Sequence, residues 1–332
     1  MSFIQDGIIG RWNKLVYETS SQIKKLQNHN QQPAEKPDET LFKRYPLNLN
    51  RISSFDEYQS FIEKNKEVLT YRKQAERDLI NNKYGLLLKG FCYACGGPAL
   101  FFTRYKYHPV HIDGERMPNW HEGLVCSGCK MNNRMRGAIH ALDKILKPKK
   151  EDDIYLTEQT THMYRWFSNN YKMVVGSEYL GDSVPCGSEN EDKIRNEDLR
   201  NLSFSSNKFD LIISLSVLEH IPDYLPTLKE GYRCLKPGGT LVLHVPFFPE
   251  YKNNLVRATM TPRGEIEHLL PPEYHGDPLN TSGVLCYCHF GWELLQQLRD
   301  SGFSNVYASF FWSPHWGYLG KDLAVIFAEK SP

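Results

Sequence analysis

The chain has 332 residues, of which 40% are hydrophobic and 13% aromatic. That is enough apolar material for a sizeable packed core, and it excludes global disorder. Mean hydropathy is −0.52, and the longest apolar runs, such as residues 323–328, fall far short of the roughly 18–20 residues that a membrane span needs. The N-terminus also lacks the pattern of a secretory signal. We therefore expect a soluble cytoplasmic protein with no membrane span.

The net charge of +1 conceals a division between the two halves of the chain. Residues 1–150 contain 25 Lys and Arg against 15 Asp and Glu, whereas residues 151–332 contain 15 against 24. The first half is therefore basic and the second acidic. Such asymmetry fits two modules that attract one another, or a basic module that meets a polyanion.

Residues 1–85 are predicted to form a helical extension. Apolar side chains recur at helical spacing through the first thirty residues, and a polar, proline-containing linker follows at 28–40. A second helix is predicted over 54–81, opened by a capping sequence. These helices could pack on the rest of the protein, form a homodimer interface or touch a membrane surface.

Two Cys-x-x-Cys pairs, Cys92 with Cys95 and Cys126 with Cys129, dominate the next segment. In a reducing compartment such pairs are more often metal ligands than disulfides, and two pairs at this spacing argue against a redox pair. Four thiolates suit a tetrahedral zinc ion and leave no position open, so the site is predicted to be structural. With a helix predicted over 130–146, residues 86–148 resemble a treble-clef or zinc-ribbon module.

Basic residues surround that predicted helix. They are Lys130, Arg134, Arg136, Lys144, Lys147, Lys149 and Lys150. They could bind nucleic acid, or simply form a solvated helix face with lysines favoured near its C-terminus. No aromatic residues are interleaved for base stacking.

Residues 149–332 alternate short buried strands with helices, which predicts a parallel sheet wrapped by helices. Helices are predicted at 223–235 and 290–303. The predicted strands cover 153–158, 172–178, 192–198, 209–216, 239–246, 305–312 and 322–329.

One run carries a family resemblance: "NKFDLIISLSVLEHIPDYLPTLKEGYRCLKPGGTLVLHVPF" at 207–247. It resembles class I S-adenosylmethionine-dependent methyltransferases, particularly the methyltransferase type 11 branch, in its strand, "LEH" turn, helix and "LKPGG" turn. The resemblance implies a Rossmann-like, seven-stranded α/β sheet that ends in an antiparallel hairpin. With the cysteine pairs, "VVGSEYL" and "PPEYHGDP", the chain also resembles a bacterial subgroup linked to surface-polysaccharide biosynthesis.

The resemblance and the fold together nominate cofactor-binding residues, since ligands of open α/β sheets lie beyond the carboxyl ends of the strands. Glu178 ends the second strand, where an acid can accept both ribose hydroxyls. The other candidates are Glu158, Gln159, Thr160, Gly176, Asp198, Leu199, Ser216, Glu219 and His220. The alternative for the acidic ones is that they are surface carboxylates or a helix-capping acid.

The first loop departs from the family pattern. Where the family carries glycines, residues 155–167 read "YLTEQTTHMYRWF", with none. Either S-adenosylmethionine binds an altered loop, which is the reading we favour, or the domain has lost the cofactor.

The segment 247–290, between the fifth strand and the last helix, is predicted to cap the substrate. His275 oriented by Asp277 is the expected general base, with Tyr274 beside it. A second metal site involving His268 and His275 is an alternative, and so is a proline-ordered loop without catalytic groups. Trp312 and Trp316 could stack on a sugar or base, or pack in the core.

The sequence therefore predicts a zinc-containing S-adenosylmethionine-dependent methyltransferase. The expected acceptor is polar, a small molecule or most plausibly a sugar hydroxyl of a glycan or its precursor. One alternative is an RNA or DNA methyltransferase that uses the basic module. Another is a non-catalytic scaffold of the same fold.

Overall fold

The computed structural model describes residues 46–80, 86–103, 110–112, 115–277, 279–321 and 323–332. The helix and linker predicted within residues 1–40 lie outside this part of the chain. None of the helices that the structure describes is both long enough and apolar enough to cross a membrane.

The chain forms two compact units that are each discontinuous in sequence. Within the described residues, unit 1 comprises 46–49, Ile62–Lys144 and Phe311–Leu323. Unit 2 comprises Asn50–Phe61, Ile145–Phe310 and Ala324–Pro332. The domain boundaries predicted at residues 85 and 148 stay predictions.

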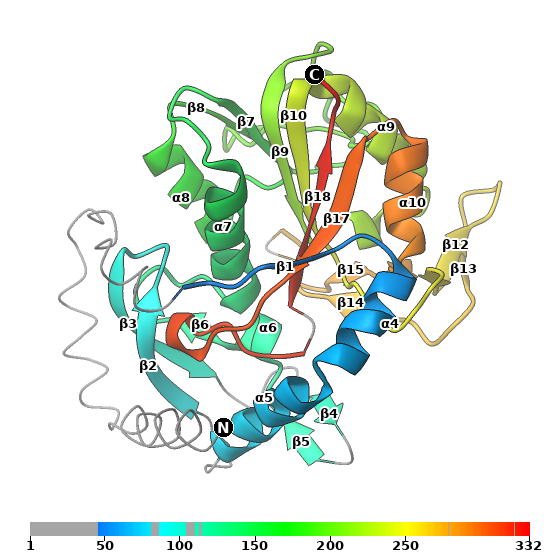
Figure 1. The fold of residues 1–332 in the computed structure, drawn as a ribbon. Helices are drawn as coiled ribbons and strands as arrows, with labels where there is room; N and C mark the ends of the chain where they lie inside the picture. The colour runs from blue at the N-terminus through cyan, green and yellow to red at the C-terminus, as the bar shows by residue number, and fades with distance from the viewer. Residues whose placement is uncertain (1–45, 81–85, 104–109, 113–114, 278, 322) are drawn as a thin grey trace. The chain divides into compact units, whose positions relative to one another are not determined.

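Unit 2 is built on a mixed, seven-stranded sheet (Figure 1). In spatial order its strands are β1 (Asn50–Ile52), β17 (Asn305–Phe310), β18 (Ala324–Glu329), β10 (Leu235–His244), β9 (Phe209–Leu215), β7 (Asp153–Leu156) and β8 (Met173–Gly176). Strands β8, β7, β9 and β10 are parallel, whereas β17 and β18 form the antiparallel pair that the sequence predicts. Six of the seven residues of β9 are buried, as expected for a strand covered on both faces.

The predicted third strand, 192–198, is wrong as a strand. Its residues form only isolated bridges, Asn196 with Glu178 and Arg195 with Glu189. The seventh strand is instead β1, which pairs antiparallel with β17 through Arg51 and Ser309. Asn196 is buried and its side chain bonds backbone groups of residues 180 and 184, so local polar contacts replace the ladder.

Helices flank the sheet through apolar faces. Helix α8 (His162–Asn170) contacts β8, α9 (Leu225–Cys234) contacts β10, and α10 (Glu293–Asp300) contacts β17 (Figure 1). The short helix η1 (Leu218–His220) follows β9 and contains the "LEH" turn. The helix predicted over 54–81 is two helices, α4 (Phe55–Lys64) and α5 (Lys66–Asp78), because Asn65 adopts a non-helical ψ of 13°.

The segment 247–290 leaves the sheet after β10 and folds into three small antiparallel pairs. These are β11 (Leu255–Val256) with β16 (Cys288–His289), β12 (Ala258–Met260) with β13 (Ile266–His268), and β14 (Tyr274–His275) with β15 (Val284–Leu285). The β14–β15 pair matters most for the site, because it fixes the position of His275.

Unit 1 contains the cysteine pairs. Its elements are α5, β2 (Leu86–Cys92), β3 (Gly97–Thr103), β4 (Val110–Ile112), β5 (Glu115–Met117), α6 (Trp120–Gly123), β6 (Val125–Cys126), η2 (Pro314–Trp316) and all but the last two residues of α7 (Asn133–Leu146). Strands β2, β3 and β6 form an antiparallel sheet. Helix α7 is the one predicted after the second cysteine pair, and it begins three residues later than expected, at Asn133.

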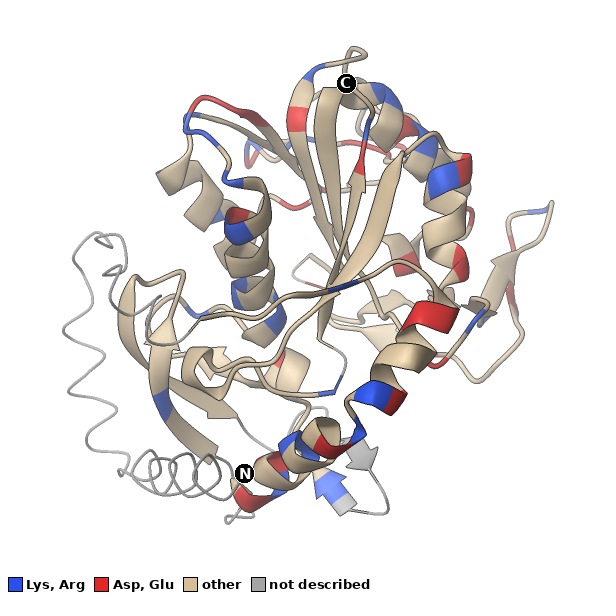
Figure 2. Ribbon diagram, viewed as in Figure 1, with Lys and Arg blue, Asp and Glu red and all other residues tan. Residues whose placement is uncertain are grey.

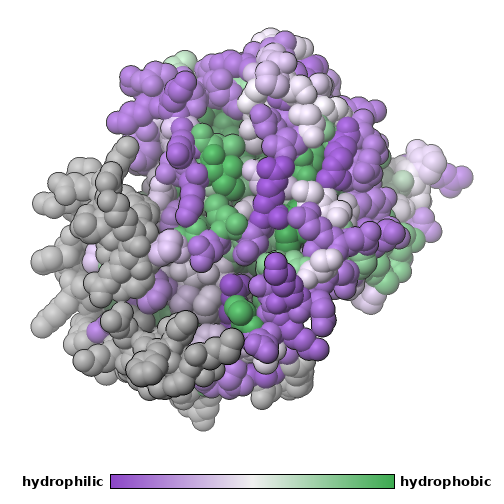
Figure 3. Space-filling model, in the orientation of Figure 1, coloured by the Kyte–Doolittle hydropathy of each residue, from purple (hydrophilic) through white to green (hydrophobic). Residues whose placement is uncertain are grey.

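Charged side chains lie mainly on helices and loops (Figure 2). Strands β9, β10 and β18 are almost free of them, which agrees with their burial. Seen from the same side, hydrophilic residues cover most of the described surface, and apolar residues show only in separate areas (Figure 3).

Candidate functional site

A cavity of about 700 Å³ lies in unit 2, where β7, β8 and β9 end. Its volume falls in the range of small-molecule and cofactor sites, roughly 300–1,000 Å³. Its position is the one expected for ligands of open α/β sheets. Its lining includes Thr157, Glu178, Leu180, Asp198, Leu199, Arg200, Ser216, His220, Met260, Asp277, Asn280, Leu285 and Tyr287. The sequence nominated six of these: Glu178, Asp198, Leu199, Ser216, His220 and Asp277.

Glu178 uses half of its carboxylate to hold the first loop. Its Oε1 accepts hydrogen bonds from the backbone N–H of Gln159 (2.8 Å), from the backbone N–H of Thr160 (2.9 Å) and from Thr160 Oγ1 (2.8 Å). Oε2 has no hydrogen-bond partner among the described residues, and Glu178 lines the cavity. The residue therefore fixes the loop and keeps one acceptor oxygen for a ligand.

The glycine-free first loop is ordered by side chains. Gln159 Nε2 donates to the carbonyl of Lys193 (2.9 Å), and Gln159 Oε1 accepts from the backbone N–H of Arg195 (2.8 Å). Thr161 caps helix α8 by accepting from Tyr164 N (3.2 Å). Gln159 thus binds the segment where the third strand was predicted, and the loop needs no glycine to hold its course.

Five nominated cofactor-binding residues, Glu158, Gln159, Thr160, Gly176 and Glu219, do not line the cavity as the described part of the chain forms it. At Gly176, an added Cβ would lie 2.5 Å from the Tyr164 ring and 2.8 Å from the Glu158 carbonyl oxygen. The prediction that Gly176 contacts a cofactor is therefore not supported. This glycine lets helix α8 pack closely on the end of β8.

Asp198 contributes a charged side chain to the wall of the cavity. Arg200 donates to both of its carboxylate oxygens, at 3.0 Å from Nε to Oδ1 and 2.8 Å from NH2 to Oδ2. These hydrogen bonds lower the pKa of Asp198, so it stays ionised at neutral pH. Arg200 also lines the cavity, and sequence reasoning missed it.

Ser216 lies at the end of β9 with a φ of 56°, a left-handed conformation that few non-glycine residues adopt. Its backbone N–H donates to the carbonyl of His244 at 2.6 Å. This contact ties the ends of β9 and β10 together. Strained backbone of this kind tends to occur at functional sites.

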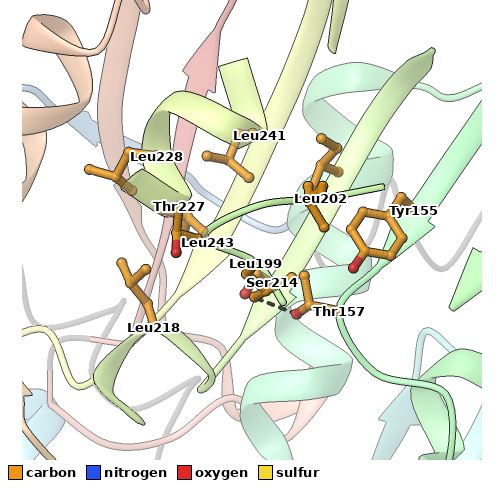
Figure 4. A pocket seen from close by; sticks show the side chains of 12 residues that line it. Tyr155, Thr157, Leu199, Leu202, Ser214, Leu218, Thr227, Leu228, Leu241 and Leu243 are labelled. Carbon is orange, nitrogen blue, oxygen red and sulfur yellow. Dashed lines mark hydrogen bonds between the residues drawn. The ribbon is translucent and has the colours of Figure 1, made fainter. Parts of the chain in front are cut away.

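A second, much smaller cavity of about 20 Å³ adjoins the first (Figure 4). Its walls are mostly leucines, among them Leu228, Leu241 and Leu243, and Thr157 Oγ1 donates to Ser214 Oγ at 3.0 Å beside them. The space suffices for about one water molecule. It is a packing gap beneath helix α9 and not a ligand site.

The four predicted zinc ligands converge in unit 1. The sulfurs of Cys92, Cys95, Cys126 and Cys129 all lie within 4.8 Å of one another. Cys92 Sγ is 3.7 Å from Cys129 Sγ, and Cys95 Sγ is 3.7 Å from Cys126 Sγ. A tetrahedral zinc ion bonded to sulfur at about 2.3 Å holds neighbouring sulfurs about 3.8 Å apart. The donor set and its spacing therefore suit zinc.

Most of the basic residues around α7 are already engaged. Arg136 is fully buried and donates to three backbone carbonyls, of Leu124, Trp316 and Gly317. Arg134 pairs with Glu122, Lys130 donates to the Ser127 carbonyl and Lys144 to the Leu47 carbonyl. Arg136 therefore does not belong to the predicted nucleic-acid patch, whereas Lys130, Lys144, Lys147, Lys149 and Lys150 are exposed. Trp316 is also fully buried, so it packs in the core and does not offer a stacking surface.

A group of titratable side chains surrounds Glu219, beside the large cavity. Glu219 Oε1 lies 3.8 Å from His220 Nε2 and 3.7 Å from His275 Nδ1. His275 Nε2 lies 3.0 Å from Glu273 Oε1, which is also 3.2 Å from His289 Nε2. The prediction that Asp277 orients His275 is therefore wrong. Glu273 is the partner, while Asp277 accepts the backbone N–H groups of residues 279 and 280.

The surroundings of His275 favour its charged form. Contact with the Cys286 thiol, then with the carboxylates of Glu219 and Glu273, raises the pKa of His275 to about 11. An imidazole that already carries two protons cannot accept another, so the general-base role stays a prediction that requires a different state of this group. Tyr274 is 57% exposed and does not line the cavity of the described chain.

Sequence reasoning missed Glu273, Cys286 and His289, whose ligand atoms lie within 4.8 Å of one another. These residues share no motif. The only signal in the sequence is that Glu273 and His289 stand in two short runs rich in such residues, "EYH" at 273–275 and "CYCH" at 286–289.

Comparisons with known proteins find similarity to methyltransferases. Residues 160–243 match the family model described as a methyltransferase domain. A demethylmenaquinone methyltransferase of Staphylococcus saprophyticus is 36% identical over 74 residues, which is 21% of this chain and 32% of that protein. The enzyme of the same name from Listeria welshimeri is 35% identical over 149 residues, which is 40% of this chain and 60% of that protein.

Solved structures add similarity at low identity. An S-adenosylmethionine-dependent methyltransferase from Mesorhizobium loti is 18% identical, with 57% of this chain and 96% of that chain covered at a TM-score of 0.38. The Burkholderia thailandensis 1,6-didemethyltoxoflavin-N1-methyltransferase, solved with S-adenosylhomocysteine, is also 18% identical, with 60% and 79% covered at a TM-score of 0.36. The residues that match the methyltransferase-domain model include β8, β9 and most of β10.

Proposed function

We propose that this protein is an S-adenosylmethionine-dependent methyltransferase whose cofactor occupies the cavity of about 700 Å³. The observation that carries the proposal is Glu178, an acid at the end of β8 that keeps one carboxylate oxygen without a protein partner at the cavity wall. The methyltransferase-domain match spans the same strands. Because the chain covers only 32–60% of the curated relatives named above, the activity itself remains a proposal.

The residues of the cavity fit this cofactor in three places. Glu178 Oε2 is positioned to accept hydrogen bonds from ribose hydroxyls. Asp198 and Leu199 offer an acceptor and an apolar surface for the adenine ring. Ser216, which has a left-handed backbone conformation at the end of β9, lines the cavity where the cofactor would bind.

S-adenosylmethionine supplies a methyl group on a sulfonium sulfur, which a nucleophile can displace. The protein's contribution is to hold the acceptor in line with that group and to exclude water. Side chains from segment 247–290, namely Met260, Asp277 and Asn280, form the wall available for an acceptor.

The loop contacts favour an enzyme over a scaffold that has lost its cofactor. The family's glycines are missing, yet Gln159 and Glu178 hold the loop in place without them. A scaffold without a cofactor gives no reason for Glu178 to bind the loop with one carboxylate oxygen while the other oxygen has no protein partner among the described residues.

For the acceptor we propose a polar molecule, with a sugar hydroxyl of a glycan or its precursor as the leading candidate. Asp277, Asn280 and Tyr287 line the cavity and can bond hydroxyl groups. The demethylmenaquinone enzymes named above make a quinol the natural rival. The engagement of Arg134, Arg136 and Lys144 within the protein weighs against RNA or DNA.

We also propose that Cys92, Cys95, Cys126 and Cys129 hold a structural zinc ion, because their sulfur spacing matches a tetrahedral site. Four thiolates occupy every position of such an ion, which leaves none for a substrate. The ion would join the two knuckles to the start of helix α7.

The test is a calorimetric titration of S-adenosylhomocysteine into wild-type protein, Glu178→Gln and Glu191→Gln. In Glu178→Gln the new amide oxygen can still accept the loop's hydrogen bonds, so this change removes mainly the charge and the second acceptor. Hydrogen bonds to a charged group are worth about 1.5–3 kcal/mol, so we expect affinity to fall roughly 10- to 100-fold. Glu191 is exposed in a neighbouring loop, and its variant should bind like wild type.

Absence of binding to folded wild-type protein would overturn the proposal and leave the scaffold as the better explanation. Equal affinities for Glu178→Gln and wild type would place the cofactor elsewhere. If binding is established, transfer of a labelled methyl group to glycan, quinol or RNA acceptors separates the candidate substrates.

A further inference from the structure

We propose that Glu219, His220 and His275 bind one divalent transition-metal ion at the wall of the large cavity. This site is separate from the four cysteines and lies wholly within unit 2. Binding of the ion does not depend on the methyltransferase proposal. Its suggested use, holding an oxygen atom of the acceptor, rests on that proposal.

The first observation is that the buried carboxylate of Glu219 accepts no hydrogen bond from the described residues. The Glu219 side chain is 0% exposed, and neither of its oxygens has a hydrogen-bond partner among the described residues. Burying an ionised carboxylate is costly unless it is paired or coordinates a metal. The carboxylate is therefore suited to a cation on the side it faces, either the protonated imidazole of His275 or a bound metal ion.

The second observation is the direction of the two imidazoles that face this carboxylate. His220 Nε2 and His275 Nδ1 lie 3.8 Å and 3.7 Å from Glu219 Oε1, just beyond hydrogen-bonding distance. Ligand atoms bonded to a tetrahedral zinc ion at about 2.0–2.2 Å are about 3.3–3.6 Å apart. Both histidine nitrogens thus lie at nearly the separation from Glu219 Oε1 that a shared ion imposes, and the ligand atoms of the three residues lie within 4.8 Å of one another.

The third observation concerns the opposite nitrogen of each ring. His220 Nδ1 contacts the carbonyl of Leu285 at 2.8 Å, and His275 Nε2 contacts Glu273 Oε1 at 3.0 Å. Metal-binding histidines almost always donate their second N–H to a carbonyl or a carboxylate, which turns the free lone pair toward the ion. Both histidines have this arrangement, with the second nitrogen of each ring directed at Glu219, and binding of the ion would displace the proton on His275 Nδ1.

Glu273 extends the network away from the proposed ion. Its Oε1 also contacts His289 Nε2 at 3.2 Å, and its other oxygen pairs with Arg257 at 3.2 Å. Contacts this short are hydrogen bonds and ion pairs, whereas those around Glu219 are longer. Glu273 and His289 therefore support His275, and they are not the first choice for the ion itself.

The donor set selects the class of ion. Two imidazoles and one carboxylate suit Zn²⁺ and its first-row neighbours, whereas Mg²⁺ and Ca²⁺ prefer oxygen ligands. Three protein ligands leave a coordination position open, as in catalytic zinc sites. Because His220 also lines the cavity, this position is suited to an oxygen of a hydroxyl-bearing acceptor.

The experiment counts metal ions. Protein freed of metal and reconstituted with Zn²⁺ is desalted and analysed for zinc per chain. We expect two equivalents for wild type and one for Glu219→Gln or His275→Gln, which retain the cysteine site. Cys129→Ser should lose the other ion, whereas Cys186→Ser, which changes an exposed cysteine, should keep both. His268→Asn alters an exposed histidine in the same segment and should also keep both.

A variant of the supporting residue locates the ion. Loss of such an outer partner typically costs 10- to 100-fold in metal affinity, so Glu273→Gln should weaken zinc binding by that factor without abolishing it. The proposal is overturned if wild type binds a single equivalent, or if Glu219→Gln and His275→Gln retain two. The proposal is also overturned if Glu273→Gln loses the second zinc ion and Glu219→Gln keeps it, since that result places the ion at Glu273, Cys286 and His289.

Two controls keep the outcomes separate. Thermal unfolding of each metal-free variant shows whether it folds, and His275→Gln substitutes if Glu219→Gln does not. S-adenosylhomocysteine titration of zinc-loaded wild-type protein measures cofactor binding separately from the metal count. If the protein binds the second zinc ion but no S-adenosylhomocysteine, the metal-site proposal stands and the methyltransferase proposal is overturned.

Discussion

Single residues explain why the first loop works without glycine. Glu178 Oε1 accepts three hydrogen bonds from Gln159 and Thr160, and the Gln159 amide reaches the segment at 193–195. The glycine that the loop does require is Gly176, on the neighbouring strand, where the Tyr164 ring fills the Cβ position. The hydrogen bonds of Glu178 and Gln159, together with the close packing of Tyr164 on Gly176, hold the first loop in place of the family's glycines.

Gly176→Ala is expected to destabilise the protein by about 1–3 kcal/mol, the usual range for overpacking a core. The new methyl group would lie 2.5 Å from the Tyr164 ring and 2.8 Å from the Glu158 carbonyl oxygen, so helix α8 or the loop must move. Urea unfolding measures the change. Gly276→Ala is the matched control, because an added Cβ there meets nothing within 4 Å. Equal stability of the two variants would contradict this packing.

At this scale the sequence predicted those site residues that follow strands. Glu178 and Ser216 were nominated at the ends of strands and line the cavity, and Asp198 also lines it although the strand predicted before it does not form. Glu273 was not nominated, because its closeness to His275 and His289 depends on the pairing of β14 with β15. Nothing in the local sequence specifies which of several acids in segment 247–290 faces a histidine.

Among the elements, α5 carries a buried acid that links it to residues 312–320 of the same unit. Glu76 is 8% exposed, and its Oε1 accepts from Trp312 Nε1 at 2.6 Å and from the backbone N–H of Gly320 at 2.7 Å. Burial raises the pKa of Glu76 in spite of these hydrogen bonds. The folded chain therefore holds this proton more tightly than the unfolded chain does.

Such a group stabilises the fold below the unfolded pKa of about 4.3, and this contribution is lost as pH rises through the folded value. Glu76→Gln keeps an oxygen for Trp312 and Gly320 but never ionises. We predict that the stability of Glu76→Gln relative to wild type increases between pH 4.5 and pH 7. Urea unfolding across that range measures it, with Glu67→Gln, exposed on the same helix, as control. A pH-independent difference would show that burial does not penalise this charge.

Element types were predictable where periodicity was strong, and failed where tertiary contacts decide. The strands β7, β8, β9, β10, β17 and β18 and the helices α9 and α10 lie within the predicted segments or beside them. The segment 192–198 has the pattern of a strand, but Asn196 and Gln159 satisfy its backbone without a ladder. Strand β1 has only three residues and pairs with β17 more than 250 residues away, which no local pattern reveals.

On the scale of the whole molecule, the division of charge and the division into units do not follow one boundary. Residues 50–61 join the mainly acidic second half in unit 2, whereas Phe311–Leu323 joins the cysteine-containing segment in unit 1. Arg136 was predicted to lie on a basic surface, but its side chain is buried and donates hydrogen bonds to the carbonyls of residues 124, 316 and 317. The mutual attraction of the two halves stays a prediction.

The central claim is that the cavity at the ends of β7, β8 and β9 holds the cofactor. The most direct test is a crystal structure of the protein with S-adenosylhomocysteine. We predict ribose hydroxyls within hydrogen-bonding distance of Glu178 Oε2 and adenine beside Asp198 and Leu199, with Glu178 Oε1 still bonded to Gln159 and Thr160. A ligand bound outside this cavity, or none at saturating concentration, would contradict the account.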